Sequence, residues 1–380
     1  MAVRQSTLRL ALGGALLLPT AALAADRTID SEAGPLRVTT VTDDLSRPWG
    51  FEFLPDGAML VTEKAGTMRI VGQDGKVGGP IAGVPKVDAG GQGGLLDVAL
   101  DPDFATNRLI YFTYAERGEG GNSTAIGKAR LSPNGRALEN VQKIFTQMPK
   151  YDGPNHFGSR IVFDREGHLF AGFGERSDNR IREKAQTLDN HLGKVIRIDR
   201  DGSVPEGNPF ATREGAKPEI WSYGHRNIQG GALNPETGAV WFSEHGPKGG
   251  DEVNIVEPGQ NYGWPLVSYG VNYDGTPVGT GKESGEGLTP PILHWTPVIG
   301  ASGMAFYTGE AVPAWKGSAF FGGLATRELV RVKFDGPKPV AEERLLQDFG
   351  KRIRDVKQGP DGAIYVATDD GAIMRVAPAT

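Results

Sequence analysis

Cysteine is absent from the 380 residues of the chain, which excludes disulfide bonds and any chemistry that needs a thiolate. Stability must therefore come from a large core, a closed architecture or a bound metal. After the N-terminus, no segment approaches the roughly 20 consecutive apolar residues of a membrane-spanning helix. The formal net charge of −5 leaves no excess of positive charge to attract nucleic acid.

Helical periodicity is also scarce, and its best candidate is the short segment RIREKAQTLDN at residues 180–190. Glycine (55 residues) and proline (26 residues) are abundant instead. Because they are spread between apolar runs, they indicate many turns between strands rather than a disordered chain.

The first 24 residues have the pattern of a secretory signal. Arg4 and Arg9 precede an apolar run to Ala22, and small residues at Ala22 and Ala24 resemble a processing site. We predict cleavage after Ala24 and a periplasmic protein. The alternative is a membrane anchor, which is less favoured because the apolar run is short and contains Pro19.

One sequence pattern recurs along the rest of the chain: an apolar strand, a turn of the Pro-Asp-Gly type and a second strand. Copies begin near residues 49, 98, 161, 231, 304 and 356, a spacing that fits one four-stranded sheet per repeat. We predict an all-β fold, a six-bladed β-propeller that forms a single domain from residue 25 to 380. Residues 35–41 (PLRVTTV) are expected to close the ring by pairing with the last blade. Two stacked β-sandwiches are the alternative.

Polar side chains gather in the loops beside these hairpins, and in a propeller such loops meet around the central channel. Arg352 and Arg354 share one face of a strand while Ile353 points the other way. Guanidinium groups match carboxylates, so we expect a planar, polyanionic ligand, with solvated surface arginines as the alternative. The loop residues that we expect to converge are Gln92, His156, Glu175, Arg226, Asn227, His245, Arg352 and Arg354.

The ordered motifs GQGGLLDVALDPDF, NHFGSR, GHRNIQG, SEHGPKGGDEVNIVEPGQNYGWP and RIRDV resemble those of the soluble quinoprotein glucose and aldose sugar dehydrogenases. The resemblance covers nearly the whole chain after the signal sequence, and the short loops favour the aldose sugar dehydrogenase subgroup. It implies a six-bladed propeller with pyrroloquinoline quinone (PQQ) over the channel, bound through calcium. It also implies oxidation of the C1 hydroxyl of aldose sugars to lactones, with electrons passed to an external acceptor.

By this resemblance, His156 is the base that takes the proton of the C1 hydroxyl while hydride leaves for the quinone. Glu175 occupies the position of its orienting carboxylate, where the family usually has aspartate. The two residues lie at opposite ends of one predicted hairpin, so they are expected to meet. Arg226 is expected to stabilise charge on the quinone oxygens. The alternative for the pair is a solvated loop histidine with an unrelated glutamate.

The resemblance also assigns the remaining contacts. The carbonyls of Gly246 and Pro247 match ligands of the cofactor's calcium, and Glu252 with the Tyr262 carbonyl matches a second, structural calcium site. For that second site, an acidic turn that caps itself is the alternative. The expected cofactor contacts are Gln92, Arg226, Asn227, His245, Asp251, Arg352 and Arg354.

Two further positions depart from the family pattern. His245 stands where the glucose enzymes tend to have glutamine. Ala325 stands where the family often has a lysine that contacts PQQ, with Arg327 as the candidate substitute. Two other functions are open at this point, a non-catalytic propeller that binds a partner or glycan and a calcium-dependent lactonase. A protein that only binds a partner has no need of His156, Arg226, Asn227, Arg352 and Arg354 together, which argues against the first. A lactonase would need a metal site rich in carboxylates, whereas the residues expected around the channel are rich in arginine.

Overall fold

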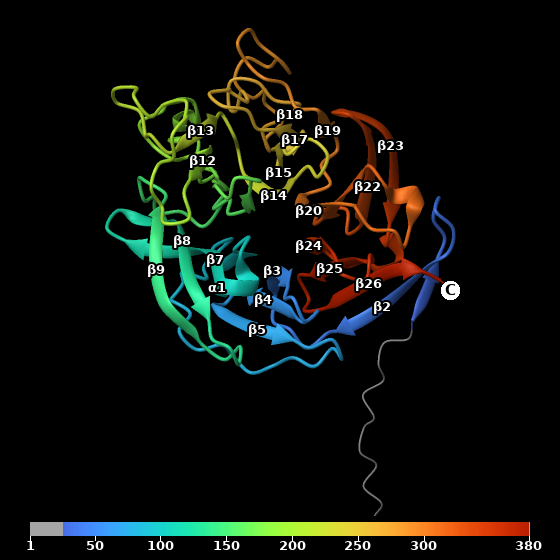
Figure 1. Ribbon diagram of the computed structural model, residues 1–380. Helices are drawn as coiled ribbons and strands as arrows, with labels where there is room; N and C mark the ends of the chain where they lie inside the picture. The colour runs from blue at the N-terminus through green and yellow to red at the C-terminus, as the bar shows by residue number, and fades with distance from the viewer. Residues whose placement is uncertain (1–25, 380) are drawn as a thin grey trace, which may run out of the picture.

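The computed structural model describes residues 26–379. Its strands form six antiparallel sheets arranged as blades around a central axis, together with one small two-stranded ribbon (Figure 1). The predicted six-bladed β-propeller is therefore confirmed. The predicted signal sequence, residues 1–24, lies outside the described residues.

The first three blades use strands that follow one another along the chain. The first blade contains β3 (Pro48–Phe53), β4 (Met59–Glu63) and β5 (Thr67–Val71). The second contains β6 (Leu95–Leu100), β7 (Leu109–Gly118), β8 (Gly121–Leu131) and β9 (Leu138–Thr146), with the short helix α1 (Phe104–Asn107) after β6. The third contains β10 (Ile161–Phe163), β11 (Leu169–Gly172), β12 (Lys194–Ile198) and β13 (Ile220–Tyr223).

The next two blades follow the same plan. The fourth contains β14 (Ile228–Leu233), β15 (Val240–Glu244), β17 (Asp251–Ile255) and β19 (Leu293–Trp295), beside a small ribbon of β16 (Lys248–Gly249) and β18 (Gly270–Val271). The fifth contains β20 (Ala301–Phe306), β21 (Ser318–Gly323), β22 (Leu329–Asp335) and β23 (Lys338–Leu345), with the 3-10 helix η2 (Pro313–Trp315). All six predicted repeats fall on the first hairpin of a blade. The segment 180–190 forms only the 3-10 helix η1 (Arg182–Gln186).

The last blade closes the ring by combining both ends of the chain. It contains β24 (Ile353–Gln358), β25 (Ile364–Thr368) and β26 (Ile373–Pro378), preceded by the 3-10 helix η3 (Gln347–Phe349), and it is completed by β2 (Leu36–Thr42) and β1 (Arg27–Ile29). In Figure 1, β2 lies beside β26, with Val38 opposite Val376. The expected closure by residues 35–41 is confirmed, and it joins the chain ends without a disulfide.

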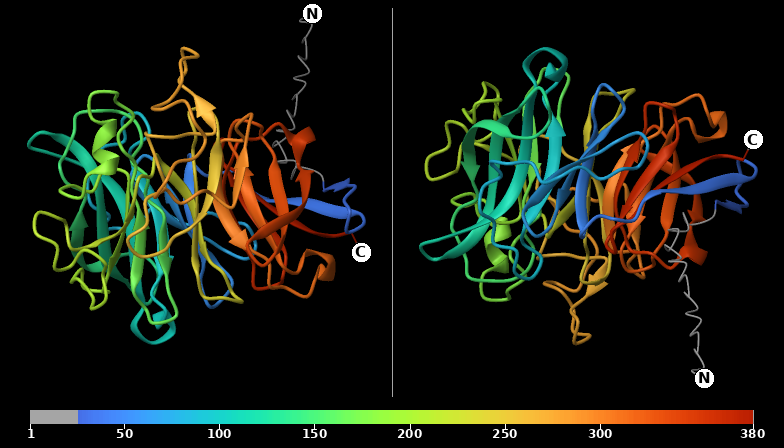
Figure 2. Two further views of the ribbon diagram at one scale, coloured as in Figure 1. Left: turned by 90° about the horizontal axis from the view of Figure 1, so that it is seen from above. Right: turned by 90° about the horizontal axis from the view of Figure 1, so that it is seen from below.

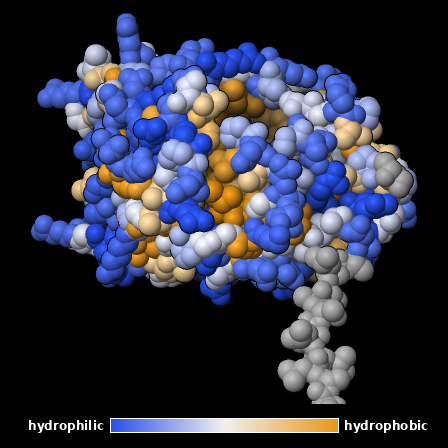
Figure 3. Space-filling view, turned by 60° about the horizontal axis from the view of Figure 1, so that its bottom comes forward, coloured by the Kyte–Doolittle hydropathy of each residue, from blue (hydrophilic) through white to orange (hydrophobic). Residues whose placement is uncertain are grey.

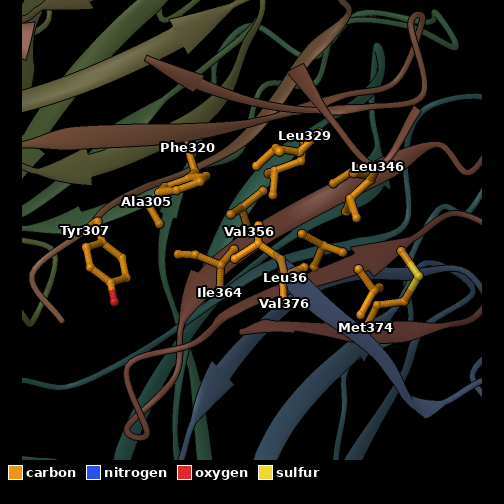
Figure 4. Close-up of a cluster of buried hydrophobic side chains, with 14 of the residues drawn as sticks. Leu36, Ala305, Tyr307, Phe320, Leu329, Leu346, Val356, Ile364, Met374 and Val376 are labelled. Carbon is orange, nitrogen blue, oxygen red and sulfur yellow. The ribbon is translucent and has the colours of Figure 1, made fainter. Parts of the chain in front are cut away.

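Apolar side chains seal the boundaries between blades. Figure 4 shows Leu36 of β2 packed in one cluster with Val356 and Ile364 of the sixth blade and with Phe320 and Leu329 of the fifth. Each of these five side chains is at most 1% exposed. Burial of large aliphatic and aromatic groups contributes roughly 1.5–3 kcal/mol each, so such clusters replace the covalent links that the sequence lacks.

An ion network crosses the middle of the ring. The buried Arg160 forms ion pairs with Asp97 at 2.8 Å and with Asp355 at 2.9 Å. The carboxylates also accept backbone N–H groups, from Ile161 to Asp97 and from Phe51 to Asp355. This network links the second, third, sixth and first blades.

Replacing Asp355 with alanine is expected to lower the free energy of unfolding by about 3–5 kcal/mol, because it leaves the buried Arg160 charge with one carboxylate. Urea denaturation measures this loss. Asp361→Ala is the matched control, because Asp361 pairs with Arg375 on the surface at 2.7 Å and should contribute under about 1 kcal/mol. Equal losses in the two variants would contradict a role of the network in holding the ring.

The two faces of the ring carry different loops. In Figure 2, the segment between β18 and β19 extends from one face of the ring. In Figure 3, most of the visible surface is hydrophilic, and the apolar residues gather in a hollow and a strip below it. Within residues 26–379, no helix is long and apolar enough to cross a membrane.

Candidate active site

His156 and Glu175 form a buried pair at the start and end of the first hairpin of the third blade. His156 precedes β10, with a left-handed backbone (φ 50°), and its N–H donates to Gln92 Oε1 at 2.8 Å. Its Nδ1 lies 2.7 Å from Glu175 Oε1, and the two residues are only 5% and 1% exposed. The expected contact between the two side chains is confirmed.

The carboxylate of Glu175 is fixed by its own neighbours. Its second oxygen accepts the Ser177 N–H at 2.8 Å, and its backbone N–H donates to Arg226 O at 3.0 Å. Because the carboxylate accepts the Nδ1 hydrogen of His156, the free lone pair of the neutral ring lies on Nε2. Burial and the positive charge of Arg226 lower the pKa of His156, and Glu175 opposes them. The ring is therefore a neutral base near pH 7.

Arg226 and Asn227 lie between β13 and β14, where they are 5% and 1% exposed. Arg226 Nη1 donates to the carbonyls of His245 at 2.9 Å and Gly246 at 2.6 Å, and its guanidinium lies 5.1 Å from the Trp264 ring centroid. Among the described residues, neither Arg226 Nε nor Asn227 Nδ2 has a hydrogen-bond partner. Two buried donors thus remain available to a ligand.

Glu244, at the end of β15, fixes the backbone of the loop that contains Arg226 and Asn227. Its Oε2 accepts the backbone N–H groups of Arg226 at 2.5 Å and Asn227 at 3.3 Å. Its Oε1 accepts from His225 Nδ1 at 2.9 Å and Asn254 Nδ2 at 3.0 Å. The sequence reasoning missed Glu244, although it is the second residue of the motif that contains His245.

Glu252 of β17 lies directly opposite Glu244 of β15. Burial and the Glu244 charge raise the pKa of Glu252 well above its usual value. Among the described residues, the one hydrogen bond to its carboxylate is from Asn254 Nδ2 at 3.4 Å, and Asn254 Oδ1 is buried with no partner there. A carboxylate beside an unsatisfied amide oxygen fits a hard cation such as calcium. Tyr262 lies nearby, its ring stacked on that of His225 with centroids 4.6 Å apart.

Asp251 supports the Gly246–Pro247 turn through its side chain. One of its oxygens accepts the Gly246 N–H at 2.9 Å, and the other accepts those of Gly300 at 2.7 Å and Ala301 at 2.9 Å. Its side chain is buried and both of its oxygens accept backbone donors, which gives Asp251 a positioning role. Its predicted contact with the cofactor stays a prediction. Gly246 is required here, because a Cβ would lie 2.2 Å from the carbonyl oxygens of Gly249 and Gly250.

Two cavities border these residues. The first, here called the arginine cavity, has a volume of about 400 Å³ and is lined by Arg47, Pro48, Trp49, Lys64, Gly91, Gln92, Phe157, Gln229, His245, Leu324, Arg352, Arg354 and Asp369. The second, here called the Glu175 cavity, has a volume of about 310 Å³ and is lined by Glu175, Ser177, Asp178, Asn179, Arg182, Arg226, Pro247, Trp264, Asn272 and Tyr273. His156 bonds one lining residue of each cavity, Gln92 and Glu175.

Positive charge dominates the arginine cavity. Arg352 and Arg354 both donate to Asp369, through their Nε atoms at 2.8 and 2.9 Å, which confirms that they share a face. Arg47 and Lys64 add two further cations, against the single carboxylate of Asp369. Burial and Arg226 lower the pKa of His245 to about 3, so this ring is neutral.

Comparison with protein families shows which family the chain belongs to. The profile of the Glucose / Sorbosone dehydrogenase family matches residues 45–375. The chain belongs to this family.

Several members of the glucose/sorbosone dehydrogenase family are similar over almost their full length. The aldose sugar dehydrogenase of Escherichia coli strain K12 is 44% identical over 348 residues, covering 90% of this chain and 93% of the relative. The crystal structure of the soluble E. coli aldose sugar dehydrogenase in the apo-form has a TM-score of 0.87 at 42% identity, covering 90% and 99% of the two chains. The PQQ-bound aldose sugar dehydrogenase from Streptomyces coelicolor has a TM-score of 0.74 at 28% identity, covering 92% and 99%.

The site of this family member fits a planar ligand rich in carboxylate and carbonyl oxygens. Three of the buried polar atoms that lack partners in the described structure belong to predicted cofactor contacts, namely Arg226 Nε, Asn227 Nδ2 and His245 Nε2. Unsatisfied buried polar atoms are costly and uncommon, and here they accompany a cavity with excess positive charge. Arg327, the candidate substitute for the family lysine, is exposed and has only a 3.5 Å contact with Gly350 O. It does not line the arginine cavity.

Proposed function

We propose that this protein is a PQQ- and calcium-dependent aldose sugar dehydrogenase that oxidises the C1 hydroxyl of aldoses to lactones and passes the electrons to an external acceptor. The observation that carries this proposal is the buried His156–Glu175 pair at 2.7 Å. Glu175 lines the cavity that contains Arg226, and Gln92, which accepts the His156 N–H, lines the cation-rich cavity. Relatives described as aldose sugar dehydrogenases support the substrate class, and the PQQ-bound Streptomyces relative supports the cofactor. The signal-like N-terminus supports a periplasmic location.

The cofactor would be held by the cationic residues of the arginine cavity and by the buried polar groups that have no hydrogen-bond partner in the described structure. PQQ is a planar quinone with several carboxylates, and when bound it supplies an acceptor for an electron pair. Guanidinium forks bind such carboxylates well. The residues that would hold it are Gln92, Arg226, Asn227, His245, Arg352 and Arg354.

Two calcium sites are part of the proposal. The carbonyls of Gly246 and Pro247 would ligate the ion that accompanies the cofactor, since a carbonyl oxygen has two lone pairs and Gly246 O uses one for Arg226. Glu252 and the Tyr262 carbonyl would ligate the structural ion, with Asn254 Oδ1 as an added oxygen ligand. Oxygen ligands of this kind suit calcium.

The chain's own groups supply the acid–base part of the reaction. Nε2 of His156 accepts the proton of the C1 hydroxyl as the C1 hydrogen leaves with its electron pair. Glu175 holds the ring through Nδ1 and stabilises the imidazolium that forms. Arg226 presents fixed positive charge to the negative charge that develops on the electron acceptor, and it needs no reorganisation because the His245 and Gly246 carbonyls and the backbone contacts to Glu244 hold it.

The same observations give less support to the two alternative functions. A metal-dependent lactonase needs several carboxylates around its ion, whereas the arginine cavity is lined by one. A propeller that only binds a partner has no use for a buried histidine–carboxylate pair beside an arginine with an unpaired Nε atom.

Reconstitution tests the proposal directly. Purified protein incubated with PQQ and calcium is expected to reduce an artificial dye when glucose or another aldose is added, and to need both PQQ and calcium for it. Protein that does not bind PQQ at micromolar concentration, or that binds it and oxidises no aldose, overturns the proposal.

Glu175→Gln is expected to move the acid limb of the pH profile of kcat/KM to lower pH. The active form of His156 is neutral, so activity falls as the pH drops through its pKa; the Glu175 charge raises that pKa, and its removal lowers it. The plateau rate should also fall by about 10- to 100-fold, because the ring becomes a weaker and less oriented base. Glu175→Asp keeps the charge and should keep the acid limb near its original pH. An acid limb that stays in place or rises in Glu175→Gln would contradict this role.

A further inference from the structure

The arginine cavity contains an ammonium group from the first blade that none of the roles above explains. Lys64 directly follows β4 and lines this cavity with Arg47, Arg352 and Arg354. Its Nζ donates one hydrogen bond, to the Ala89 carbonyl at 2.7 Å. Within residues 26–379 it forms no ion pair with a carboxylate.

The charges around Lys64 are unfavourable for a cation in the free protein. Partial burial, Arg47 and Arg354 lower the pKa of Lys64, in that order, and the more weakly acting carboxylates of Asp369 and Asp88 oppose them. Asp369 already receives hydrogen bonds from Arg352 and Arg354, and Asp88 pairs with Arg117 at 3.1 Å. A cluster of cations without enough counter-charge is what an anionic ligand would neutralise.

The backbone of Lys64 is held in place before any ligand arrives. Its N–H donates to Arg47 O at 3.0 Å, and its carbonyl accepts the Leu95 N–H at 3.0 Å. Gly94 packs so closely on this carbonyl that a Cβ there would lie 2.1 Å from the oxygen. These contacts bind the first blade to the second and fix where the lysine side chain starts. Preorganisation of this kind reduces the entropy lost when a ligand binds.

We propose that Lys64 binds a carboxylate of the quinone cofactor, so that the first blade supplies the lysine contact that Arg327 of the fifth blade cannot make. This inference rests on the proposed function, because it assumes that PQQ occupies the arginine cavity. Lys64 is a binding residue in this account. It takes no part in the proton transfer at His156.

The test is a titration of the cofactor-free protein with PQQ in the presence of calcium, followed by tryptophan fluorescence. Trp49 lines the same cavity, so binding should change its emission. Lys64→Met is expected to weaken PQQ binding by about 10- to 100-fold, as for loss of a charge-assisted hydrogen bond. Lys64→Arg should remain within a few-fold of the wild type. Arg327→Met, which removes an exposed cation outside the cavity, is the matched control and should bind PQQ normally.

A salt series separates ligand binding from a purely structural role at Ala89. If Lys64 acts through its charge, the ratio of the two dissociation constants, Lys64→Met over wild type, should shrink as NaCl rises from about 50 to 500 mM. The Tm of the cofactor-free variant should stay close to that of the wild type. A ratio near one at low salt, or a loss that is independent of salt and accompanied by a lower Tm, overturns the inference while the wild type still binds PQQ. Failure of the wild type itself to bind PQQ overturns the proposed function as well.

Discussion

Replacing His156 with glutamine is expected to lower kcat for aldose oxidation by about 10²- to 10⁴-fold while PQQ binding stays within a few-fold. Glutamine fills much of the space of the ring but cannot take a proton from the C1 hydroxyl near neutral pH. The side chain it replaces is buried, held by Glu175 at 2.7 Å, and kept neutral by burial and by Arg226. Steady-state dye reduction measures kcat, and fluorescence titration of the same sample measures PQQ binding.

A second histidine–carboxylate pair provides the control for this experiment. His168 Nδ1 lies 2.9 Å from Asp164 Oδ2, but neither residue lines the two cavities. His168→Gln should therefore leave kcat unchanged. If His156→Gln keeps more than about a tenth of the wild-type kcat with PQQ bound, His156 is not the base.

Arg226→Met is expected to lower kcat by about 10²- to 10³-fold, as for removal of a preorganised group that stabilises developing charge. PQQ binding should weaken too, because the variant loses the buried Nε donor and the guanidinium fork, whose Nη1 donates to both the His245 and the Gly246 carbonyl. Arg226→Lys keeps the charge but loses the fork, so it should recover part of kcat and little of the affinity. Pre-steady-state reduction of bound PQQ separates the rate of the chemical step from the affinity.

The matched control for Arg226 is an arginine that also donates to two carbonyls but lies on the surface. Arg165 Nη2 donates to Pro235 O at 2.6 Å and to Glu236 O at 3.4 Å. Arg165→Met should leave both kcat and PQQ affinity unchanged. An Arg226→Met variant that, saturated with PQQ, reduces it at the wild-type rate would show that Arg226 binds the cofactor without acting on the reaction.

The blades were predictable because their signals are local. Alternating apolar residues around a tight turn specify a hairpin within about 20 residues, and repetition of that hairpin gives the number of blades. The contact between His156 and Glu175 was predictable for the same reason, since both end one hairpin. The segment at 180–190 shows the limit of local signals. Its residues favour a helix, but only Arg182–Gln186 form a 3-10 turn.

The supporting residues of the site were not predicted, although Glu244 and Asp369 are as near in the chain to their partners as Glu175 is to His156. Glu244 and Asn254 act from neighbouring strands on a loop that precedes both of them. Asp369 reaches Arg352 and Arg354 across the last blade, and Lys64 reaches the cavity from the first. Glu244 and Asn254 even belong to one of the motifs that indicated the family. A motif alone does not show which of its polar side chains turn toward a neighbouring loop, because that depends on how the strands and loops pack together.

The most direct test of the account is a single turnover without oxygen or dye. Protein loaded with PQQ and calcium is mixed with excess glucose, and the absorbance of the quinone is followed. The account predicts that the bound quinone is reduced in one rapid phase in the wild type, and more slowly by about 10²- to 10⁴-fold in His156→Gln. PQQ that binds but is reduced by no aldose, or that is reduced equally fast in both proteins, would contradict it.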